Sequence, residues 1–283
     1  MDKQIVKILK QALAEDIGRG DVTTNILIPQ DKKVRAVILF QESGVICGLE
    51  VVKNIFRILD RNISFMTRHK DGDKVKAGVR VATVYGKARA ILSAERTALN
   101  FLSHLSGIAT QTRSSVELTR PFKTKITDTR KTLPNLRLLQ KYAVRCGGGY
   151  NHRFGLDQMV LIKDNHKEIR LRELGIVGLV KEARKSSGDK KIEIEVENLK
   201  EYIETLMARP DIIMLDNMKL SDIKKAVKLR TKDRRFKNIK LEVSGKVSLE
   251  NIHQIAQAGA DMISVGRLTH SPLAIDVSLE IIK

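Results

Sequence analysis

Six short apolar segments recur between residues 125 and 265, and stretches of helical periodicity separate them. Alternating strands and helices are typical of a parallel sheet with helical crossovers, which makes this part of the chain α/β. We predict a barrel in preference to an open sheet, because polar residues follow so many of the strands. The predicted strands are Lys125–Asp128, Met159–Ile162, Ile192–Val196, Ile212–Leu215, Lys240–Val243 and Met262–Val265.

Polar or glycine residues stand at the carboxyl ends of these predicted strands. In a parallel barrel all carboxyl ends open on one face, so these residues should meet there. The sequence therefore predicts a functional site at this face. The residues concerned are Asp128-Thr129-Arg130, Lys163-Asp164, Glu195, Asp216-Asn217, Ser244-Gly245 and Gly266-Arg267.

Cationic side chains and flexible backbone are concentrated between residues 129 and 166. Arginine grips carboxylate or phosphate through a planar fork, lysine adds a mobile point charge, and consecutive glycines let the backbone approach a ligand. We expect this segment to bind a small polyanion. It contains Thr129-Arg130-Lys131-Thr132, Lys141, Arg145, Gly147-Gly148-Gly149, Asn151-His152-Arg153 and Lys163-Asp164-Asn165-His166.

Three side chains at the predicted site have more than one interpretation. His152 is either a hydrogen-bond donor to a bound anion or an ordinary loop residue, and a general-base role is open. Glu195 and Asp216 either hold Mg²⁺ beside a phosphate-rich ligand or neutralise neighbouring cations. Glu193 and Glu197 share the face of Glu195 by strand alternation, so only position relative to the strand end separates the three.

Two late strand ends carry serine and glycine. Ser244-Gly245-Lys246 and Ser264-Val265-Gly266-Arg267 each follow a predicted strand and precede a helix expected at Ser248 or Ser271. Late loops of such barrels often hold a phosphate group with backbone amides and a helix N-terminus. We therefore predict a phosphate site at these two loops.

The first part of the chain mixes helices and strands and leads into one long helix. Its hydrophobic periodicity and turn residues define the elements. Gly107 is a candidate break in the long helix. The predicted elements are helix Gln4–Ala14, strand Val34–Phe40, helix Leu49–Leu59, strands Ile63–Arg68 and Val79–Tyr85, and helix Ala88–Arg120.

Charge and composition narrow the function classes. The formal net charge of +19 fits a nucleic-acid surface, an enzyme of anionic substrates or a lysine-rich solvated surface. Nucleic acid is the weaker interpretation, because tryptophan is absent and aromatic residues make up only 4 % of the chain. Two cysteines define no disulfide framework or zinc site, which favours a reducing cytoplasm. Without a run of about eighteen apolar residues, a membrane span is not expected.

Beyond these patterns, nearly the whole chain resembles the family of quinolinate phosphoribosyltransferase, also called nicotinate-nucleotide pyrophosphorylase (carboxylating). The stretch from Asp128 through Arg153 is similar to the family core almost residue for residue. Further matching motifs are Leu13-Ala14-Glu15-Asp16-Ile17-Gly18, Asp21-Val22-Thr23-Thr24, Glu95-Arg96 with Leu99-Asn100, Ile162-Lys163-Asp164-Asn165-His166, Leu215-Asp216-Asn217 and Leu268-Thr269-His270-Ser271.

The resemblance implies an architecture and a reaction. The fold would be an N-terminal α/β sandwich over residues 1–107, an incomplete α/β barrel over 108–270, and a C-terminal helix over 271–283 that rejoins the first domain. The reaction would be phosphoribosyl transfer from phosphoribosyl pyrophosphate to quinolinate with decarboxylation, giving nicotinate mononucleotide, pyrophosphate and CO₂ in NAD biosynthesis. The enzyme, a pentosyltransferase, would use Mg²⁺ and act in the cytoplasm as a homodimer or higher homo-oligomer.

The resemblance also assigns roles to single residues. Lys131, Lys163, Glu195 and Asp216 would be catalytic, and Glu195 and Asp216 would hold Mg²⁺ and the ribose hydroxyls. The residues around quinolinate would be Arg130, Lys131, His152, Arg153 and Lys163, with Arg96 from the neighbouring subunit. The residues at the 5-phosphate would be Ser244, Gly245, Gly266 and His270. Lys246 departs from the family, which more often has a small residue there; it either contacts phosphate or points outward.

Two other functions stay open at this stage. A related protein associated with molybdenum transport shares the fold and many motifs, although the intact cationic cluster argues against it. A protein that uses an enzyme scaffold to bind nucleic acid or another polyanion would also explain the high net charge.

Overall fold

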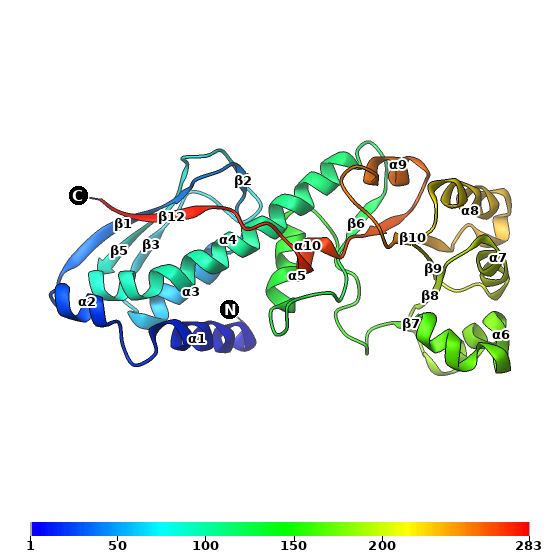
Figure 1. Ribbon diagram of the computed structural model, residues 1–283, viewed down its shortest axis with the longest axis horizontal. Coiled ribbons are helices and arrows are strands. Elements are labelled where there is room, and N and C mark those ends of the chain that lie inside the picture. The colour runs from blue at the N-terminus through cyan, green and yellow to red at the C-terminus, as the bar shows by residue number, and fades with distance from the viewer. Residues whose placement is uncertain (1, 283) are drawn as a thin grey trace. The chain divides into compact units, whose positions relative to one another are not determined.

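The computed structural model describes residues 2–282, and these form two compact units, which Figure 1 shows as ribbons. Unit 1 takes the chain up to Arg113, then Thr132–Gly148, and finally the residues from Leu268 onward. Unit 2 takes Ser114–Lys131 and Gly149–Arg267. Each unit has its own main sheet.

Unit 1 contains a four-stranded antiparallel sheet in the order β12-β1-β5-β3. Its strands are β1 (Lys33–Phe40), β3 (Ser64–Met66), β5 (Arg80–Lys87) and β12 (Val277–Ile282). A small second sheet pairs β2 (Gly44–Val45) with β4 (Lys74–Val75).

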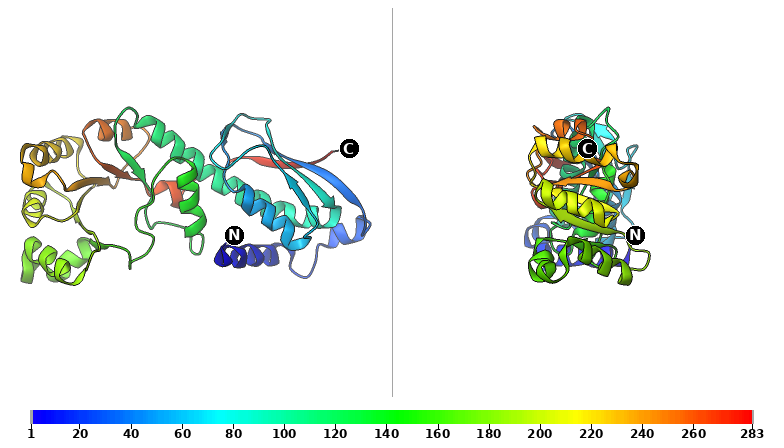
Figure 2. Two further views of the ribbon diagram at one scale, coloured as in Figure 1. Left: turned by 180° about the vertical axis from the view of Figure 1, so that it is seen from behind. Right: turned by 90° about the vertical axis from the view of Figure 1, so that its right-hand side faces the viewer.

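The helices of unit 1 pack their apolar sides inward. In α3, for example, Val51, Val52, Ile55 and Phe56 recur at helical spacing and are all buried. Figures 1 and 2 show α1, α3 and the first part of α4 along the four-stranded sheet. The helices are α1 (Lys3–Ile17), α2 (Val22–Leu27), α3 (Leu49–Leu59), α4 (Ala88–Leu118), which continues into unit 2, α5 (Arg137–Cys146) and α10 (Arg267–His270), which begins at the boundary.

Unit 2 is built on a six-stranded parallel sheet in the order β6-β11-β10-β9-β8-β7. Among the described residues the edge strands β6 and β7 are not paired with each other, so the barrel is incomplete, as predicted. The strands are β6 (Lys125–Thr127), β7 (Val160–Ile162), β8 (Ile192–Val196), β9 (Ile212–Asp216), β10 (Lys240–Ser244) and β11 (Met262–Ser264). The helices are α6 (Asp164–Ser186), α7 (Leu199–Ala208), α8 (Leu220–Lys232) and α9 (Ile252–Gln257), with a 3₁₀ turn at Arg234–Phe236.

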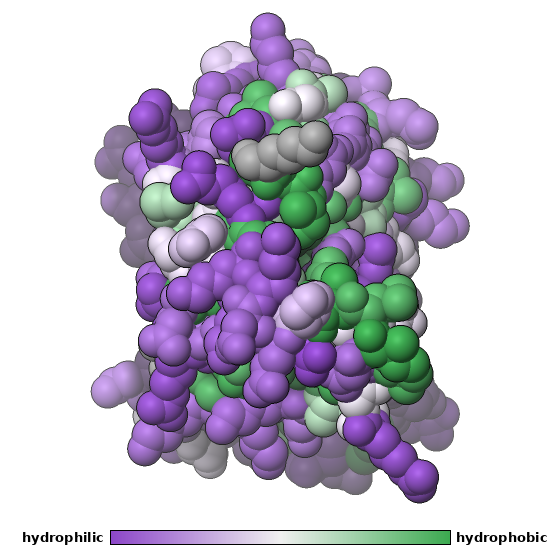
Figure 3. Space-filling model, turned by 90° about the vertical axis from the view of Figure 1, so that its left-hand side faces the viewer, coloured by the Kyte–Doolittle hydropathy of each residue, from purple (hydrophilic) through white to green (hydrophobic). Residues whose placement is uncertain are grey.

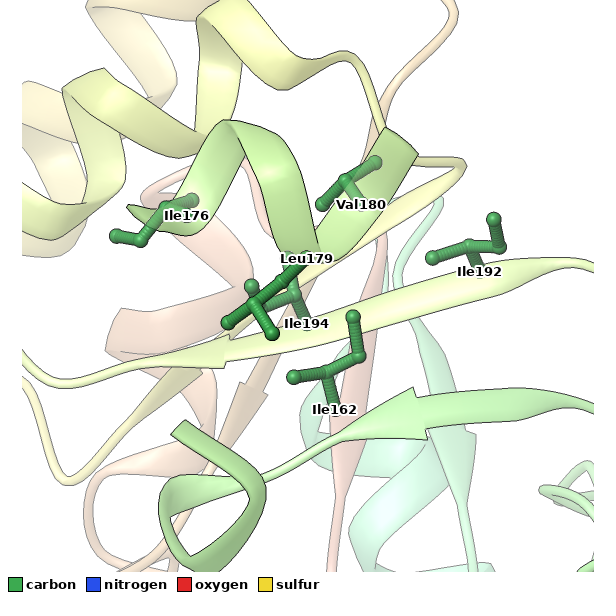
Figure 4. Close-up of a cluster of buried hydrophobic side chains, with 6 residues drawn as sticks. All are labelled: Ile162, Ile176, Leu179, Val180, Ile192 and Ile194. Carbon is green, nitrogen blue, oxygen red and sulfur yellow. The ribbon is translucent and has the colours of Figure 1, made fainter. Parts of the chain in front are cut away.

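The two faces of this parallel sheet carry different chemistry. On the outer face Ile162, Ile192 and Ile194 pack against Ile176, Leu179 and Val180 of α6, and Figure 4 shows this apolar cluster. Because side chains alternate along a strand, the residues between these isoleucines point to the inner face. There β8 places Glu193 and Glu195, both buried. The helices thus leave the inner face to polar side chains.

Two sequence predictions about helices are corrected by the structure. The predicted C-terminal helix over 271–283 is wrong, because Val277-Ser278-Leu279-Glu280-Ile281 alternates apolar and polar residues and forms β12 against β1. This strand does return the chain to unit 1, as expected. The late helix begins at Arg267 and not at Ser271.

The long helix α4 is continuous through Gly107, the candidate break. A Cβ at Gly107 would lie 2.0 Å from the backbone oxygen of Leu273, so glycine permits close packing of two backbones there. The helix had been predicted to end at Arg120 and ends at Leu118.

The compact units also differ in extent from the predicted domains, whose boundary lay at residues 107 and 108. The chain stays in unit 1 up to Arg113, and the segment around α5 belongs to unit 1 as well. Gly147 accounts for this, because its backbone oxygen accepts from Arg113 Nε at 2.9 Å and a Cβ there would lie 2.5 Å from the backbone oxygen of Ala109. No helix within residues 2–282 is long and apolar enough to cross a membrane.

Candidate active site

The inner face of the parallel sheet gathers ionisable and hydroxyl side chains in rows. Residues paired across a parallel sheet point to the same side, and Glu195 of β8 pairs with Met214, which pairs with Glu242 of β10. One row further on, Asp216 of β9 pairs with Ser244. The predicted convergence at the carboxyl ends therefore holds for Glu195, Asp216 and Ser244.

Lys163 and Glu195 form an ion pair at this end of the sheet. Lys163 follows β7 directly and is the N-cap residue of α6, and its Nζ lies 2.7 Å from Oε2 of Glu195. The lysine side chain is 44 % exposed, whereas the carboxylate is 7 % exposed. One end of the pair can therefore reach a ligand while the buried end fixes it.

The ends of β9 and β10 approach each other closely. The backbone N–H of Asn217 donates to the Ser244 oxygen at 3.1 Å, and the Asn217 amide donates to Asp216 Oδ2 at 2.6 Å. Gly245 has a φ of +103°, and a Cβ there would lie 2.3 Å from Asn217 Oδ1. Only glycine fits at this position, which explains why glycine follows Ser244 in the predicted phosphate loop.

A cavity of about 250 Å³ opens beside this glycine. Its lining includes Asn217, Ser244 and Lys246, so Lys246 borders a cavity and does not simply point away. The rest of the wall is mixed and consists of Met218, Lys219, Leu220, Ile223, Val243, Val247, Asn251, Gln254 and Ile255. Hydroxyl, amide and ammonium groups around a small cavity are suited to an anion such as phosphate.

Arg130 and Arg153 form a cationic pair in unit 2. The buried Nε of Arg130 has no hydrogen-bond partner among residues 2–282. Burial and the positive charge of Arg130 both lower the pKa of Arg153, whose guanidinium also donates to the Met159 oxygen at 2.9 Å. Two guanidinium groups close enough to repel each other favour an anion between them.

His152 has close polar contacts at both ring nitrogens and at its backbone N–H. Its Nε2 lies 3.1 Å from a carboxylate oxygen of Glu193 and 3.2 Å from one of Glu242, both completely buried. Its Nδ1 accepts from the Arg153 backbone N–H at 2.9 Å, and its own backbone N–H donates to Asp128 at 2.9 Å. The ring is thus built into the protein, not extended from a loop.

The proton distribution of this cluster follows from its contacts. Burial lowers the pKa of His152, but Glu193 and Glu242 outweigh it and raise the pKa to about 10. That shift by itself would make the ring positive, but the hydrogen bond from the Arg153 N–H to Nδ1 opposes it, because a proton on Nδ1 would point at that N–H; we follow the hydrogen bond and assign the extra proton to a carboxyl group. Burial and the charge of Glu242 raise the pKa of Glu193 to about 7, which agrees with that assignment.

Other predicted residues lie in different places. Lys131 is exposed, and its backbone N–H donates to Thr129 Oγ1 at 3.0 Å. Gly266 is half-buried between β11 and α10. Arg96 and His270 belong to unit 1, both exposed, so the structure does not place them with the residues of unit 2.

The sequence analysis missed Glu193 and Glu242 as members of the site, whereas it placed Asp128 at a strand end without giving it a role. Both glutamates, like Asp128, are completely buried. A signal was present, because acidic residues alternate with isoleucine, leucine and valine in Ile192–Val196 and Leu241–Val243. Such alternation in a sheet covered on its other face puts carboxylates inside, and buried carboxylates are rare unless they have partners.

The fit of Mg²⁺ can be judged from the donors at the sheet end. Glu195 and Asp216 lie on one face of adjacent strands and supply the hard oxygen ligands that Mg²⁺ prefers. The half-buried carboxylate of Asp216 accepts from the neutral Asn217 amide. These two residues therefore fit the predicted metal role.

Comparisons with known proteins agree along nearly the whole chain. Residues 21–106 match the description "Quinolinate phosphoribosyl transferase, N-terminal domain" and residues 108–280 the C-terminal domain. A probable nicotinate-nucleotide pyrophosphorylase (carboxylating) of Methanocaldococcus jannaschii is 44 % identical over 283 residues, covering 98 % of this chain and 97 % of the relative. The nicotinate-nucleotide pyrophosphorylase (carboxylating) of Mycobacterium leprae is 40 % identical, covering 96 % and 95 %.

Solved structures agree with this comparison. The nicotinate-nucleotide pyrophosphorylase of Francisella tularensis has a TM-score of 0.90 at 41 % identity and covers 99 % of this chain and 96 % of its own. That of Ehrlichia chaffeensis has a TM-score of 0.92 at 37 % identity and covers both chains completely.

Proposed function

The chain belongs to the quinolinate phosphoribosyl transferase family, and on that basis we propose that it transfers the phosphoribosyl group of phosphoribosyl pyrophosphate to quinolinate. The products are nicotinate mononucleotide, pyrophosphate and CO₂, and the pathway is NAD biosynthesis. Relatives carry the names nicotinate-nucleotide pyrophosphorylase (carboxylating) and quinolinate phosphoribosyltransferase (decarboxylating), which describe this reaction.

One observation in the structure carries the assignment of the quinolinate site. Arg130 and Arg153 lie close together, and Arg130 keeps a buried donor without a partner among the described residues. Quinolinate carries two neighbouring carboxylates, so it would neutralise both guanidinium groups through charge-assisted hydrogen bonds. Lys131 and Lys163 would add positive charge at the same face of unit 2.

The proposed chemistry needs orientation more than proton transfer. The pyridine nitrogen attacks the ribose carbon while pyrophosphate leaves, through an oxocarbenium-like transition state. The quaternised nitrogen then stabilises the carbanion left when the adjacent carboxylate departs as CO₂, and that carbanion takes a proton from solvent. Holding the partners in line can supply about 7 to 11 kcal/mol of the barrier. The arginines would therefore bind and orient.

Glu195 and Asp216 would hold Mg²⁺ together with the ribose hydroxyls. When bound, the metal neutralises charge on the departing pyrophosphate. The Lys163–Glu195 ion pair would keep the glutamate in one orientation and bring the lysine to the reacting groups. Ser244, Gly245 and Gly266 would receive the 5-phosphate with His270 at its border, and the cavity beside Ser244 supports this position.

The proposed assembly is a homodimer or higher homo-oligomer in which Arg96 completes the neighbour's site. Arg96 is exposed on α4, one turn after Ser93, which donates to Asp21 beside α2 at 2.9 Å. In helix α2, the side chains of Val22, Ile26 and Leu27 are each about two thirds exposed or more. An interface between two copies of the chain would bury such apolar side chains. Figure 3 shows several groups of hydrophobic side chains among hydrophilic ones on one face, the largest of them at the right of the view. Two free thiols fit the reducing cytoplasm as the compartment.

The test combines quinolinate, phosphoribosyl pyrophosphate and Mg²⁺ with the purified chain and measures nicotinate mononucleotide. Arg130→Ala should lower kcat/KM by about 100-fold or more while the protein stays folded, because a charged donor to a bound carboxylate is lost. The exposed Arg235→Ala should leave turnover unchanged. Mixing Arg130→Ala with Arg96→Ala chains should restore part of the activity if subunits share sites. Near-normal turnover of Arg130→Ala would refute the site.

A further inference from the structure

Glu193 and Glu242 are two completely buried carboxyl groups for which the proposed reaction has no direct use. They come from β8 and β10, on either side of β9, and both reach the same nitrogen of His152. Burying a carboxylate costs several kcal/mol unless hydrogen bonds or charges compensate it. Because burying two carboxyl groups is so costly, we expect the pair to have a function.

One candidate role is metal binding. His152, Glu193 and Glu242 offer ligand atoms that all lie within 4.8 Å of one another. However, His152 Nδ1 accepts a hydrogen bond from the Arg153 N–H at 2.9 Å, so the ring proton must be on Nε2. A nitrogen that carries a proton has no lone pair for a metal. The geometry therefore favours an Nε2–H placed between two carboxyl groups, 3.1 Å from one and 3.2 Å from the other and aligned for a regular hydrogen bond with neither.

Hydrogen bonds around the cluster also fix Glu242 and the backbone of His152. On one side Ser264 Oγ donates to Glu242 Oε1 at 2.5 Å, and Thr127 Oγ1 lies 2.7 Å from the same hydroxyl. On the other side Asp128 accepts from the His152 backbone and from the Asn151 amide. The imidazole is fixed at both ring nitrogens and at its backbone. These contacts restrain the turn that presents Arg153.

We propose that Glu193 and Glu242 are positioning residues that act through the His152 ring to hold Arg153 in the orientation that binds the quinolinate carboxylates. The inference rests on the proposed function for its substrate. The chain of contacts is direct: the two glutamates hold Nε2, Nδ1 holds the Arg153 backbone, and the Arg153 side chain is braced on the Met159 oxygen. The glutamates themselves do not touch the substrate.

The geometry predicts an unusual pattern of substitutions. Nε2 lies at nearly equal distances from the two carboxyl groups and is aligned with neither, so when one glutamate is removed the ring can turn to donate to the other. Glu193→Leu and Glu242→Leu should each raise the KM for quinolinate less than about threefold, whereas the double variant should raise it about 10- to 100-fold. The KM for phosphoribosyl pyrophosphate should change less than about twofold in all three. Leucine keeps the volume, and apolar replacement of buried charges is often tolerated.

A conservative variant separates positioning from packing. Glutamine has an oxygen that accepts from Nε2, so Glu242→Gln in the Glu193→Leu background should stay within about threefold of the single variant. The exposed Glu204→Gln on α7 is the matched control and should change nothing. Circular dichroism and thermal melts establish that each variant is folded. A folded double-leucine variant with the wild-type quinolinate KM overturns the proposal, as does a single variant as impaired as the double.

The protonation state of the His152 ring can be measured without substrate, so this inference can be tested even if the proposed function is wrong. In the protein labelled with ¹⁵N-histidine, long-range ¹H–¹⁵N spectra should show His152, assigned with His152→Gln, as a neutral ring protonated at Nε2. This state should be lost in the double-leucine variant. A doubly protonated ring, or a metal bound one per chain in the wild type and absent from the double variant, overturns the positioning role. If the wild type turned over no quinolinate, the proposed function would fail and the histidine spectrum would still decide the ring's partners.

Discussion

The two ends of the parallel sheet in unit 2 use the same kinds of charged residue in opposite ways. At the amino ends, Asp211 precedes β9 and accepts from the Ile192 N–H at 2.8 Å and from Arg184 at 2.9 Å. Asp261 precedes β11 in the same manner, accepting from the Leu241 N–H at 2.9 Å and pairing with Arg230. Each aspartate thus ties the start of a neighbouring strand.

At the carboxyl ends, by contrast, cationic side chains are available to bind a ligand. Arg130 keeps a buried donor without a hydrogen-bond partner among residues 2–282, and Arg153 lies close enough to it for repulsion to lower its pKa. Lys163 has Glu195 as a partner but stays 44 % exposed. In parallel barrels the carboxyl-end face carries function and the opposite face carries stability. Charge pairing separates the residues compared here: Asp211 and Asp261 are each paired with an arginine at the amino ends, whereas Arg130 has an unpartnered buried donor among residues 2–282 at the carboxyl ends.

The largest effect should come from a change at the carboxyl end. Glu195→Gln removes the charge that pairs with Lys163 and that would hold Mg²⁺, so kcat/KM should fall about 100- to 1000-fold. The free energy of unfolding should change by less than about 1 kcal/mol, because the lysine of this pair is half-exposed. Steady-state kinetics and urea denaturation measure the two quantities on one preparation. If Glu195→Gln instead lowered the free energy of unfolding by clearly more than about 1 kcal/mol, the carboxyl end would also carry stability and the distinction between the two ends would fail.

The reverse result is expected from Asp261→Asn at the amino end. Burial alone would raise the pKa of Asp261, but the Leu241 N–H, Arg230 and Lys240 lower it below the ordinary value. The substitution should therefore cost about 1 to 3 kcal/mol of unfolding free energy at pH 7, with kcat/KM within about twofold of wild type.

The pH dependence follows from the sign of this shift. A carboxyl with a lowered folded pKa stabilises the protein above its unfolded pKa of about 3.9, and the contribution is lost as the pH falls through the lower folded value. The gap between wild type and Asp261→Asn should thus be constant from pH 7 down to about pH 5 and shrink below about pH 4. Urea titrations at several pH values measure it. A gap that widened in acid would mean that Asp261 does not act as a paired carboxylate.

Much of the difference between the two ends of the parallel sheet could be predicted from the sequence. Ile192–Val196 was placed residue for residue, because a short β-branched run between turn residues has few alternatives. Convergence of Glu195, Asp216 and Ser244 followed from the parallel topology alone. The paired aspartates were not foreseen, since their partners Arg184 and Arg230 are set by how each helix packs back on the sheet, which no local pattern encodes.

The cluster around His152 shows a different limit. Glu193 was assigned to the face of Glu195 correctly, but its partner Glu242 stands 49 positions later, on a strand two places away. Only the register of β8, β9 and β10 brings both to one imidazole. The C-terminal strand is a different case: the alternation of apolar and polar residues over 277–281 is a strand pattern, whereas the expected helix came from the family resemblance alone.

Lys246 offers the smallest and most discriminating test of the comparison. It borders the cavity beside Ser244 at the carboxyl end, yet it is exposed, so it should contribute only what an exposed charge can. Lys246→Ala should raise the KM for phosphoribosyl pyrophosphate about two- to fivefold at low salt, leave the quinolinate KM unchanged, and lose most of its effect near 0.5 M salt. The exposed Lys237→Ala, remote from the cavity, controls for net charge. Equal effects of the two variants would mean that the +19 charge attracts the substrate as a whole. An effect confined to Lys246 would instead extend the phosphate site by one residue, at a position where the family more often has a small side chain.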